Sequence, residues 1–264
     1  AYAYALAAES WAEVILRRDA ADSTIDTLAE DWATALPPIV VEGGIVSGHI
    51  EDLQGRFNVN NLIDASGKPS VPDVEYFKRL LALLGLDPAL ATALLDWIDV
   101  DINATFPDGA EDDTYLLETP PYRTANSPLV SASELRLVKG YSAEAVALLE
   151  PYITALPAPT ALNVNTASPM VLQALDASLA AMDVEQIIAE RDNVEGFKDI
   201  GDFLALPALA GLPLDVDVGI QSNWFSVLTD VRIGRGQARL DSRLHRDGSV
   251  VTVGYRVRSR RLLP

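Results

Sequence analysis

The sequence predicts an α+β fold in which a helix and a small antiparallel sheet are interrupted by a large helical insertion. Residues 1–36 carry apolar side chains at helical spacing, whereas residues 43–60 and those after Trp224 alternate between apolar and polar as strands do. The block between them, residues 61–219, has mostly helical patterns. Because an isolated hairpin is marginally stable in water, we expect the two strand-rich ends to pair in one sheet against the first helix.

The first helix is predicted from apolar residues spaced three or four positions apart, with acidic residues between them. The apolar positions are Tyr4, Ala8, Trp11 and Ile15, followed by Ile25, Leu28, Ala29, Trp32 and Leu36. This spacing places them on one face of a helix. Pro37 and Pro38 would end it, because proline lacks the backbone N–H that a helix needs. We therefore expect one helix from the N-terminus to this proline pair.

The central block and the C-terminal end contain further recognisable elements. Residues 74–85 form a helical pattern that ends at Gly85, and residues 87–98 form another with Pro88 in its first turn. Residues 131–140 and 142–153 continue the helical periodicity. Near the C-terminus, Arg246-Asp247-Gly248-Ser249 predicts a hairpin turn. The expected domains are a discontinuous one, residues 1–60 with 220–264, and an inserted helical one, residues 61–219.

Composition excludes several kinds of site and partner. The formal net charge of −18 argues against nucleic acid or an anionic membrane surface as a general partner, because both are negative themselves. The absence of cysteine excludes thiolate metal sites, a cysteine nucleophile and disulfides, and two histidines are too few for a His-rich zinc or iron site. No G-x-S-x-G, phosphate-loop, dinucleotide-binding or H-E-x-x-H motif is present, so we do not expect an enzyme.

The strongest chemical signal is an acidic stretch, residues 96–116, with seven Asp and Glu and no Lys or Arg. Carboxylates at this density repel one another unless the loop stays solvated or encloses a cation. Hard oxygen donors suit Ca²⁺, which takes six to eight of them. A structural calcium site and a solvated acidic loop are therefore the two interpretations. The candidate calcium ligands are Asp99, Asp101, Glu111, Asp112, Asp113 and Asn103.

The acidic stretch does not follow the EF-hand pattern. If Asp99 is position one, Ala104 lies where the EF-hand loop needs glycine, and Ala110 lies where it needs a bidentate glutamate. Glu111 comes one residue too late. Any calcium site here would therefore be an irregular one.

A second motif, residues 162–175 followed by 184–209, resembles the helix-hairpin-helix repeats of DNA-uptake proteins. It begins with LNVNTASPMVLQAL and continues into a helical pattern. Such modules bind phosphates through hairpin amides and basic flanks. Here seven acidic residues between 183 and 202 surround only Arg191 and Lys198. We interpret the segment as a helical packing module, and nucleic-acid binding stays the alternative function.

Several segments in fixed order carry a family resemblance that spans nearly the whole chain. They are AYAYALAAESWAEVILRRD at the start, IEDLQGRFNVNNL (50–62), LLDWIDVD (94–101), GAEDDTYL (109–116), PYRTANSPLVSASELRLVKGY (121–141) and LNVNTAS (162–168). Together they closely resemble the K-type minor pseudopilins of bacterial type II secretion systems.

The resemblance implies a pilin-like fold whose inserted helical domain binds calcium, with Asp99, Asp101, Glu111 and Asp112 in the matching acidic motif. It implies a place at the tip of the periplasmic pseudopilus, in complex with I- and J-type minor pseudopilins. The H-type pseudopilin and secreted substrates are further candidate contacts. The partner-binding face of the first helix would consist of Tyr4, Ala8, Trp11 and Ile15. A hydrophobic segment before Ala1 would anchor the precursor in the bacterial inner membrane, with the globular part in the periplasm.

Overall fold

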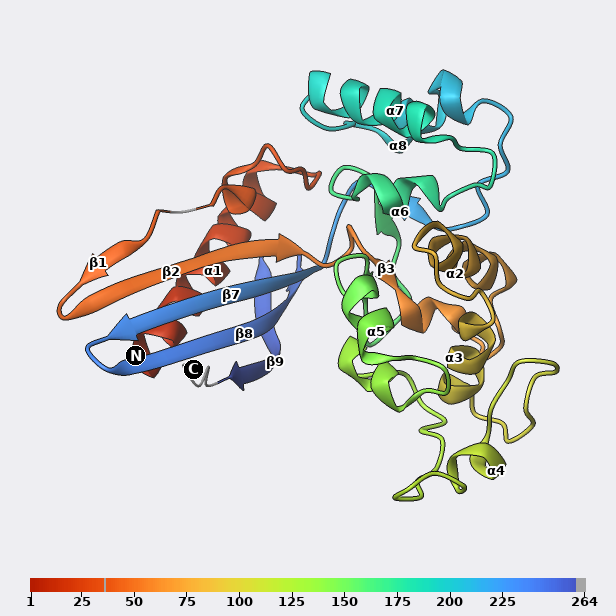
Figure 1. Ribbon diagram of the computed structural model, residues 1–264. Helices are drawn as coiled ribbons and strands as arrows, with labels where there is room; N and C mark the ends of the chain where they lie inside the picture. The colour runs from red at the N-terminus through yellow and green to blue at the C-terminus, as the bar shows by residue number, and fades with distance from the viewer. Residues whose placement is uncertain (36, 260–264) are drawn as a thin grey trace. The chain divides into compact units, whose positions relative to one another are not determined.

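The structure is a computed structural model that describes residues 1–35 and 37–259, and these form two compact units (Figure 1). The first unit consists of the described residues within 1–54, 191–199 and 220–259. The second consists of residues 55–190 and 200–219. The two ends of the chain thus meet in one unit, and most of the intervening chain forms the other.

The first unit contains a five-stranded antiparallel sheet in the order β1-β2-β7-β8-β9. Its strands are β1 (Ile39–Val41), β2 (Gly44–Asp52), β7 (Trp224–Ile233), β8 (Gly236–Asp247) and β9 (Val250–Ser259). β2 pairs with β7 from Gly44 opposite Ile233 to Asp52 opposite Phe225. The prediction that the two strand-rich ends share one sheet is therefore confirmed. Gly248, with φ of 54°, lies in the predicted turn between β8 and β9.

Helix α1 (Tyr2–Asp22) lies against this sheet (Figure 1). Its residues Ala5, Ala12 and Leu16 lie at helical spacing and are buried against strand side chains. Glu9 is buried on the same face. Both of its carboxylate oxygens accept hydrogen bonds from Arg256, each at 2.6 Å, and the Ser242 hydroxyl also donates to it. Burial raises the pKa of Glu9, but the hydrogen bonds from Arg256 and Ser242 outweigh this and hold it below its ordinary value.

The predicted single helix ends earlier than expected. α1 stops at Asp22, so the prediction of a helix to residue 36 is wrong, and Leu36 itself lies outside the described residues. After the helix, the backbone N–H of Asp26 donates a hydrogen bond to Ile220 O (2.8 Å), and the side chain of Asp26 is buried. A short 3₁₀ helix, η1 (Asp31–Ala33), then places Trp32 edge-on to Phe225, with ring centroids 5.3 Å apart. Long-range contacts, which periodicity does not register, set this boundary.

The second unit is mostly helical. Its α-helices are α2 (Val71–Leu83), α3 (Leu90–Ile98), α4 (Asp112–Tyr115), α5 (Ala143–Leu149), α6 (Pro169–Gln173), α7 (Ala181–Asn193, whose last three residues count with the first unit) and α8 (Ile200–Leu204). Its 3₁₀ helices are η2 (Val59–Leu62), η3 (Ala132–Leu137) and η4 (Pro207–Leu209). Two short parallel pairs complete it, β3 (Phe57–Asn58) with β4 (Ile153–Thr154) and β5 (Leu162–Asn163) with β6 (Val218–Gly219).

Two details of the second unit differ from the sequence patterns. The strand pattern of residues 43–60 breaks after Asp52, and Phe57 and Asn58 pair with β4 instead of joining the large sheet. The helical pattern of residues 131–140 yields the 3₁₀ helix η3, which begins with a capping box between Ser131 and Glu134. As predicted, Gly85 follows α2 with a positive φ of 71°.

Aromatic side chains build much of the second unit's core. Phe57 stacks on Tyr76 and Phe77, with centroid distances of 4.6 Å and 5.6 Å. Trp97 at the end of α3 meets Tyr115 of α4 edge-on at 5.0 Å, which fixes the two ends of the acidic stretch near each other. Among the residues that the structure describes, no helix combines the length and apolarity needed to cross a membrane.

Candidate metal centre

The acidic stretch leaves the end of α3 and returns at the start of α4 (Figure 1). Asp96, in the last turn of α3, is fully buried. Its Oδ2 accepts hydrogen bonds from the backbone N–H groups of Thr105 and Ala110, both at 2.9 Å. Gly109 permits this approach, since a Cβ at that position would lie 2.0 Å from Asp96 Oδ2. These two hydrogen bonds to Asp96 therefore hold the loop between α3 and α4 in a closed conformation.

Three predicted ligands meet inside this closed loop. Asp99, Asp101 and Glu111 each offer a carboxylate oxygen, and these atoms all lie within 4.8 Å of one another. Asp99 and Glu111 are buried, and Asp101 is exposed. In the described part of the chain, none of the three has a Lys or Arg within ion-pair distance. The cluster thus concentrates negative charge without a protein cation.

Electrostatics reflect this crowding. The pKa of Asp99 is raised to about 6, mainly by burial and also by the neighbouring carboxylates of Asp101 and Asp96. Burial also raises the pKa of Glu111, with a smaller opposing effect from the hydroxyl of Thr124, which donates to Glu111 Oε2 at 2.9 Å. Such shifts mean that the ionised cluster is unfavourable in the folded protein unless a cation neutralises it.

Unpaired oxygens point to the same conclusion. Asp96 Oδ1, Glu111 Oε1 and Asn126 Oδ1 are buried acceptor atoms that have no hydrogen-bond partner. Buried polar atoms in native proteins are normally paired, so an unpaired one calls for a specific explanation. Asn126 also has a positive φ of 42°, and its Nδ2 donates to Asp101 O at 3.1 Å. A bound cation would account for unpaired acceptors beside a carboxylate cluster.

The other predicted ligands are placed differently. Asp112 pairs with Arg123 at 3.1 Å and accepts a hydrogen bond from the backbone N–H of Thr124 at 3.1 Å. Asp113 is exposed in the first turn of α4. Asn103 uses its N–H groups to donate to Asp101 Oδ1, at 2.7 Å from the backbone and 3.1 Å from the side chain. The structure therefore brings together three of the six predicted ligands.

The donor set fits a hard divalent cation. Carboxylate and amide oxygens are the ligands that Ca²⁺ prefers, and among the described residues no histidine or cysteine joins the cluster to favour zinc. Sequence reasoning did not single out Asp96 and Asn126. Asp96 lies three residues before Asp99, and this spacing places both carboxylates on the same side of a helix end, which could have indicated Asp96 as a ligand. Asn126 comes from a separate segment, and no local pattern indicates it.

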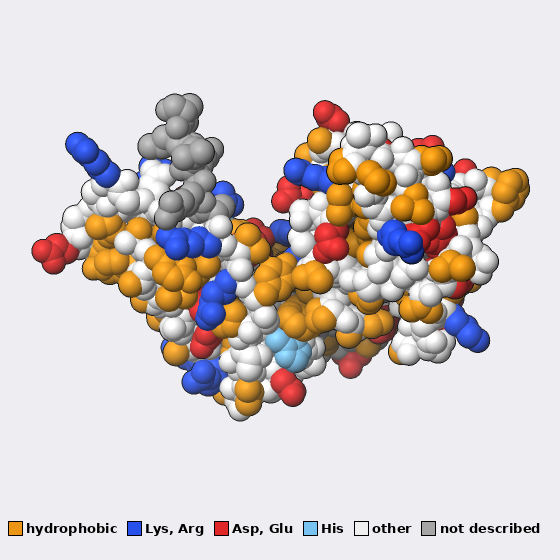
Figure 2. All heavy atoms as spheres, turned by 90° about the horizontal axis from the view of Figure 1, so that it is seen from below, with side chains coloured by type: hydrophobic (Ala, Val, Ile, Leu, Met, Phe, Trp, Pro, Cys, Tyr) orange, Lys and Arg blue, Asp and Glu red, His pale blue; other side chains and the backbone are white. Residues whose placement is uncertain are grey.

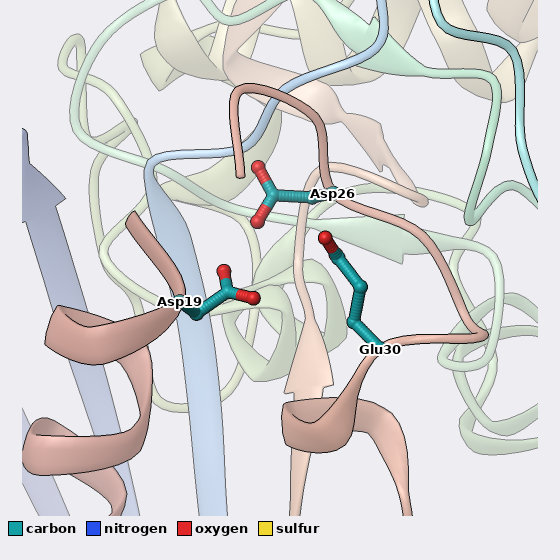
Figure 3. A group of neighbouring side chains, drawn as sticks. All are labelled: Asp19, Asp26 and Glu30. Atoms are coloured by element: carbon teal, nitrogen blue, oxygen red, sulfur yellow. The ribbon is translucent and has the colours of Figure 1, made fainter. Parts of the chain in front are cut away.

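A second carboxylate group, in the first unit, has a different character. Figure 3 shows Asp19, Asp26 and Glu30 pointing toward one another from the end of α1 and from the loop that follows it. Here the protein supplies the cation itself. Arg246 binds Asp19 at 2.7 Å and both carboxylate oxygens of Asp26 at 2.5 and 2.6 Å. This group is a structural ion-pair cluster and not a candidate metal site.

The predicted partner-binding face of α1 lies beside the face that packs on the sheet. Tyr4 and Trp11 are exposed, and Ala8 and Ile15 are half-buried. Ala8, Trp11 and Ile15 line a small apolar groove of about 50 Å³, together with residues of η1, β1, β2 and β7. These four side chains are thus available on the surface of the first unit.

Comparisons with known proteins decide the family. The family described as "Type II secretion system (T2SS), protein K" matches residues 55–158 and 162–227. The type II secretion system protein K of Pseudomonas aeruginosa is 39% identical over 264 residues, covering 95% of this chain and 78% of that protein. The protein of the same name from Aeromonas hydrophila is 33% identical, covering 92% and 79%. This chain belongs to the type II secretion system protein K family.

A solved structure supports the fold as well. In the crystal structure of the GspK-GspI-GspJ complex from the type 2 secretion system of enterotoxigenic Escherichia coli, a chain matches this one with a TM-score of 0.86 and 26% identity. The match covers 97% of this chain and 95% of the other. The α+β, pilin-like fold predicted from the sequence is confirmed. Membership of the protein K family makes this chain a minor pseudopilin of type II secretion, and it favours this role over nucleic-acid binding.

Proposed function

We propose that this protein K caps the tip of the periplasmic pseudopilus in complex with I- and J-type minor pseudopilins, as a structural subunit and not as an enzyme. The observation that carries the proposal is the structural match over 97% of the chain to a protein whose crystal structure is that of a GspK-GspI-GspJ complex. A segment before Ala1 would anchor the precursor in the inner membrane, leaving the two described units in the periplasm. The H-type pseudopilin and secreted substrates are further candidate contacts.

The surface of α1 supports assembly through helix packing. Tyr4 and Trp11 expose large aromatic side chains beside the half-buried Ala8 and Ile15. Exposed aromatic side chains next to an apolar groove are typical of a protein interface. A partner helix that packs along this face would cover them and gain the free energy of removing apolar area from water, about 25 cal/mol per Å².

The size and charge of the second unit support a terminal position. It is the larger of the two units, and a bulky insertion leaves little space for another subunit stacked above it. It also contains 22 Asp and Glu against 7 Lys and Arg, so it carries most of the net charge. Figure 2 shows Lys and Arg side chains gathered mainly on the strand-rich unit and Asp and Glu mainly on the other. Repeated copies along a shaft would bring these acidic units close together, which electrostatic repulsion opposes.

The metal proposal is that Asp99, Asp101 and Glu111 hold a structural calcium ion, with the unpaired acceptors Asp96 Oδ1 and Asn126 Oδ1 as further candidate ligands. When bound, the ion neutralises the clustered carboxylates and links the end of α3 to the start of α4. Asp112, Asp113 and Asn103 stay candidate ligands, although in this structure Asp112 is paired with Arg123. The support is the carboxylate cluster without a protein cation, together with the unpaired buried oxygens.

Assembly is tested by mixing the purified periplasmic domain with the I- and J-type partners at micromolar concentration. We expect a 1:1:1 complex in size-exclusion chromatography with light scattering. Trp11→Glu should abolish it without lowering the melting temperature, because Trp11 is exposed. Met182→Glu, at an exposed position in the second unit, is the matched control and should leave assembly intact. Failure of the unaltered domain to associate would refute the assembly proposal, and subunits spaced along the shaft in electron micrographs would refute the tip position.

A further inference from the structure

The segment that supplies Asp99 and Asp101 alternates between acidic and apolar residues. Its backbone turns through hydrogen bonds from Asp101 N to Asp99 Oδ1 (3.3 Å) and from Asn103 N to Asp101 Oδ1 (2.7 Å). The carboxylates of Asp99 and Asp101 meet Glu111 in the cluster. Val100, between the two aspartates, and Ile102, directly after Asp101, are each 75% exposed. The acidic side chains of this segment therefore belong to the carboxylate cluster, and its apolar side chains are exposed to solvent.

A third apolar side chain extends this exposed set. Phe106 is 93% exposed, the highest value among the large apolar side chains of the described residues. We call Val100, Ile102 and Phe106 the apolar loop face. Single exposed apolar residues are common on protein surfaces, but three within seven residues of one loop are a concentration that marks interaction sites. At these exposures the three side chains add little to the stability of the fold.

We propose that the apolar loop face docks a protein partner whose own apolar patch is surrounded by Lys and Arg. The inference deepens the proposed function and rests on it. Charge complementarity selects the partner, because the face lies in a unit with 22 acidic and 7 basic residues, and the nearby Asp108 is exposed. A second copy of this chain would repel it, and so would an anionic lipid surface, whereas a cationic protein surface is attracted.

The metal cluster and the docking face share one stretch of backbone. A calcium ion held by Asp99 and Asp101 would fix that backbone, and so would keep Val100 and Ile102 turned outward. A loop that is already rigid loses less conformational entropy when a partner binds, so binding is more favourable. Docking through this face should accordingly require both the ion and the apolar side chains.

The test uses the full-length protein in a secreting strain, with Ile102→Ser and Phe106→Ser combined. We expect secretion of the system's substrates into the medium to fall at least tenfold. Assembly with the I- and J-type partners and calcium-dependent melting of the purified domain should be unchanged. The matched control combines Val71→Ser and Met182→Ser, which alter two side chains of the same unit that are each 69% exposed, and it should secrete normally. Unchanged secretion by the first variant would overturn the proposal, and so would loss of assembly, since the face would then belong to the tip complex.

Two further measurements test the chemistry of the partner. Asp108→Lys should reduce secretion several-fold, whereas Glu185→Lys, at an exposed position on α7, should not. Equal effects would contradict a cationic partner. Co-sedimentation with phosphatidylglycerol and phosphatidylethanolamine vesicles in calcium should show no binding, and binding that the Ile102→Ser/Phe106→Ser variant loses would assign the face to lipid instead. Assembly of the unaltered chain with its I- and J-type partners, measured in the same series, tests the proposed function separately.

Discussion

Asp96 Oδ2 accepts a hydrogen bond from the backbone N–H of Ala110 at 2.9 Å, which joins the last turn of α3 to the residue that precedes Glu111. A second bond from Thr105 N closes the loop between them. Because Asp96 is fully buried, these bonds are shielded from water and are strong for their kind. The carboxylate cluster is therefore arranged by protein contacts that do not need an ion, and calcium would find its ligands already near one another.

Calcium should stabilise the isolated domain. At a free concentration of about 100 times Kd, mass action predicts about 2.7 kcal/mol, because the ion binds the folded chain alone. Differential scanning calorimetry with calcium and with excess chelator measures this as a difference in melting temperature. The Asp99→Asn/Glu111→Gln variant should lose the difference. Asp64→Asn, an exposed carboxylate outside the cluster, is the control and should keep it. Equal melting temperatures of the unaltered domain in calcium and in chelator would remove the metal proposal.

Gly109→Ala should disrupt the metal loop. Its Cβ would lie 2.0 Å from Asp96 Oδ2 and 2.5 Å from Thr105 N, so the loop must open or Asp96 must lose its hydrogen bonds. Leaving a buried acceptor unpaired costs about 1–3 kcal/mol. We expect calcium affinity, measured by calorimetric titration, to fall at least tenfold. Gly219→Ala is the control, because its nearest contact is an ordinary 3.5 Å from Ala161 Cβ. Similar calcium affinities for the two variants would show that Asp96 does not organise the site.

Stability without calcium should depend on pH through Asp99. Its pKa is raised in the folded protein from the ordinary 3.8 to about 6, so the protonated form favours folding. This contribution is complete below about pH 4 and is lost as pH rises through about 6. The Asp99→Asn variant removes the titration, so in chelator it should gain stability relative to the unaltered domain between pH 5 and pH 7.5. Urea unfolding at both values measures the difference, and a difference that does not change with pH would contradict the assignment.

Arg246→Met should strongly destabilise the first unit. Arg246 is buried, binds Asp19 and Asp26 and lies over the Phe225 ring at 4.7 Å. Removing one partner of a buried ion pair leaves an uncompensated charge and costs about 3–5 kcal/mol. Arg232→Met, whose side chain is largely exposed and lies 3.6 Å from Asp230, should change stability by about 0–1 kcal/mol.

Urea unfolding of the two arginine variants decides whether Asp19, Asp26 and Glu30 form a structural cluster. Combining Arg246→Met with Asp26→Leu should recover part of the loss, because the more deeply buried of the two carboxylates that bind Arg246 is then removed together with its cation. Equal, small effects of Arg246→Met and Arg232→Met would contradict the structural role. So would an increase of melting temperature with calcium in a variant that lacks Asp99 and Glu111.

Local sequence patterns determined several secondary-structure elements of this protein and the position of its acidic stretch. The spacing of Tyr4, Ala8, Trp11 and Ile15 predicted the first helix, and alternation predicted β7 to β9 with their turn at Gly248. That Ala5, Ala12 and Leu16 form the buried face of this helix came from the structure. The predicted features depend on short-range geometry, which the residue order contains directly. The acidic stretch was visible for the same reason, since Asp99, Asp101 and Glu111 are close in sequence.

Only the tertiary structure decided where local patterns stop and which distant groups meet. α1 ends at Asp22 because Asp26 is held by Arg246, which lies 220 residues further along the chain. Asp112 faces Arg123, and Asn126 brings an unpaired oxygen from a separate segment. The free energy of a buried charge or an unpaired acceptor depends on groups that are distant in sequence and meet only in the folded protein. Composition and periodicity therefore do not reveal them.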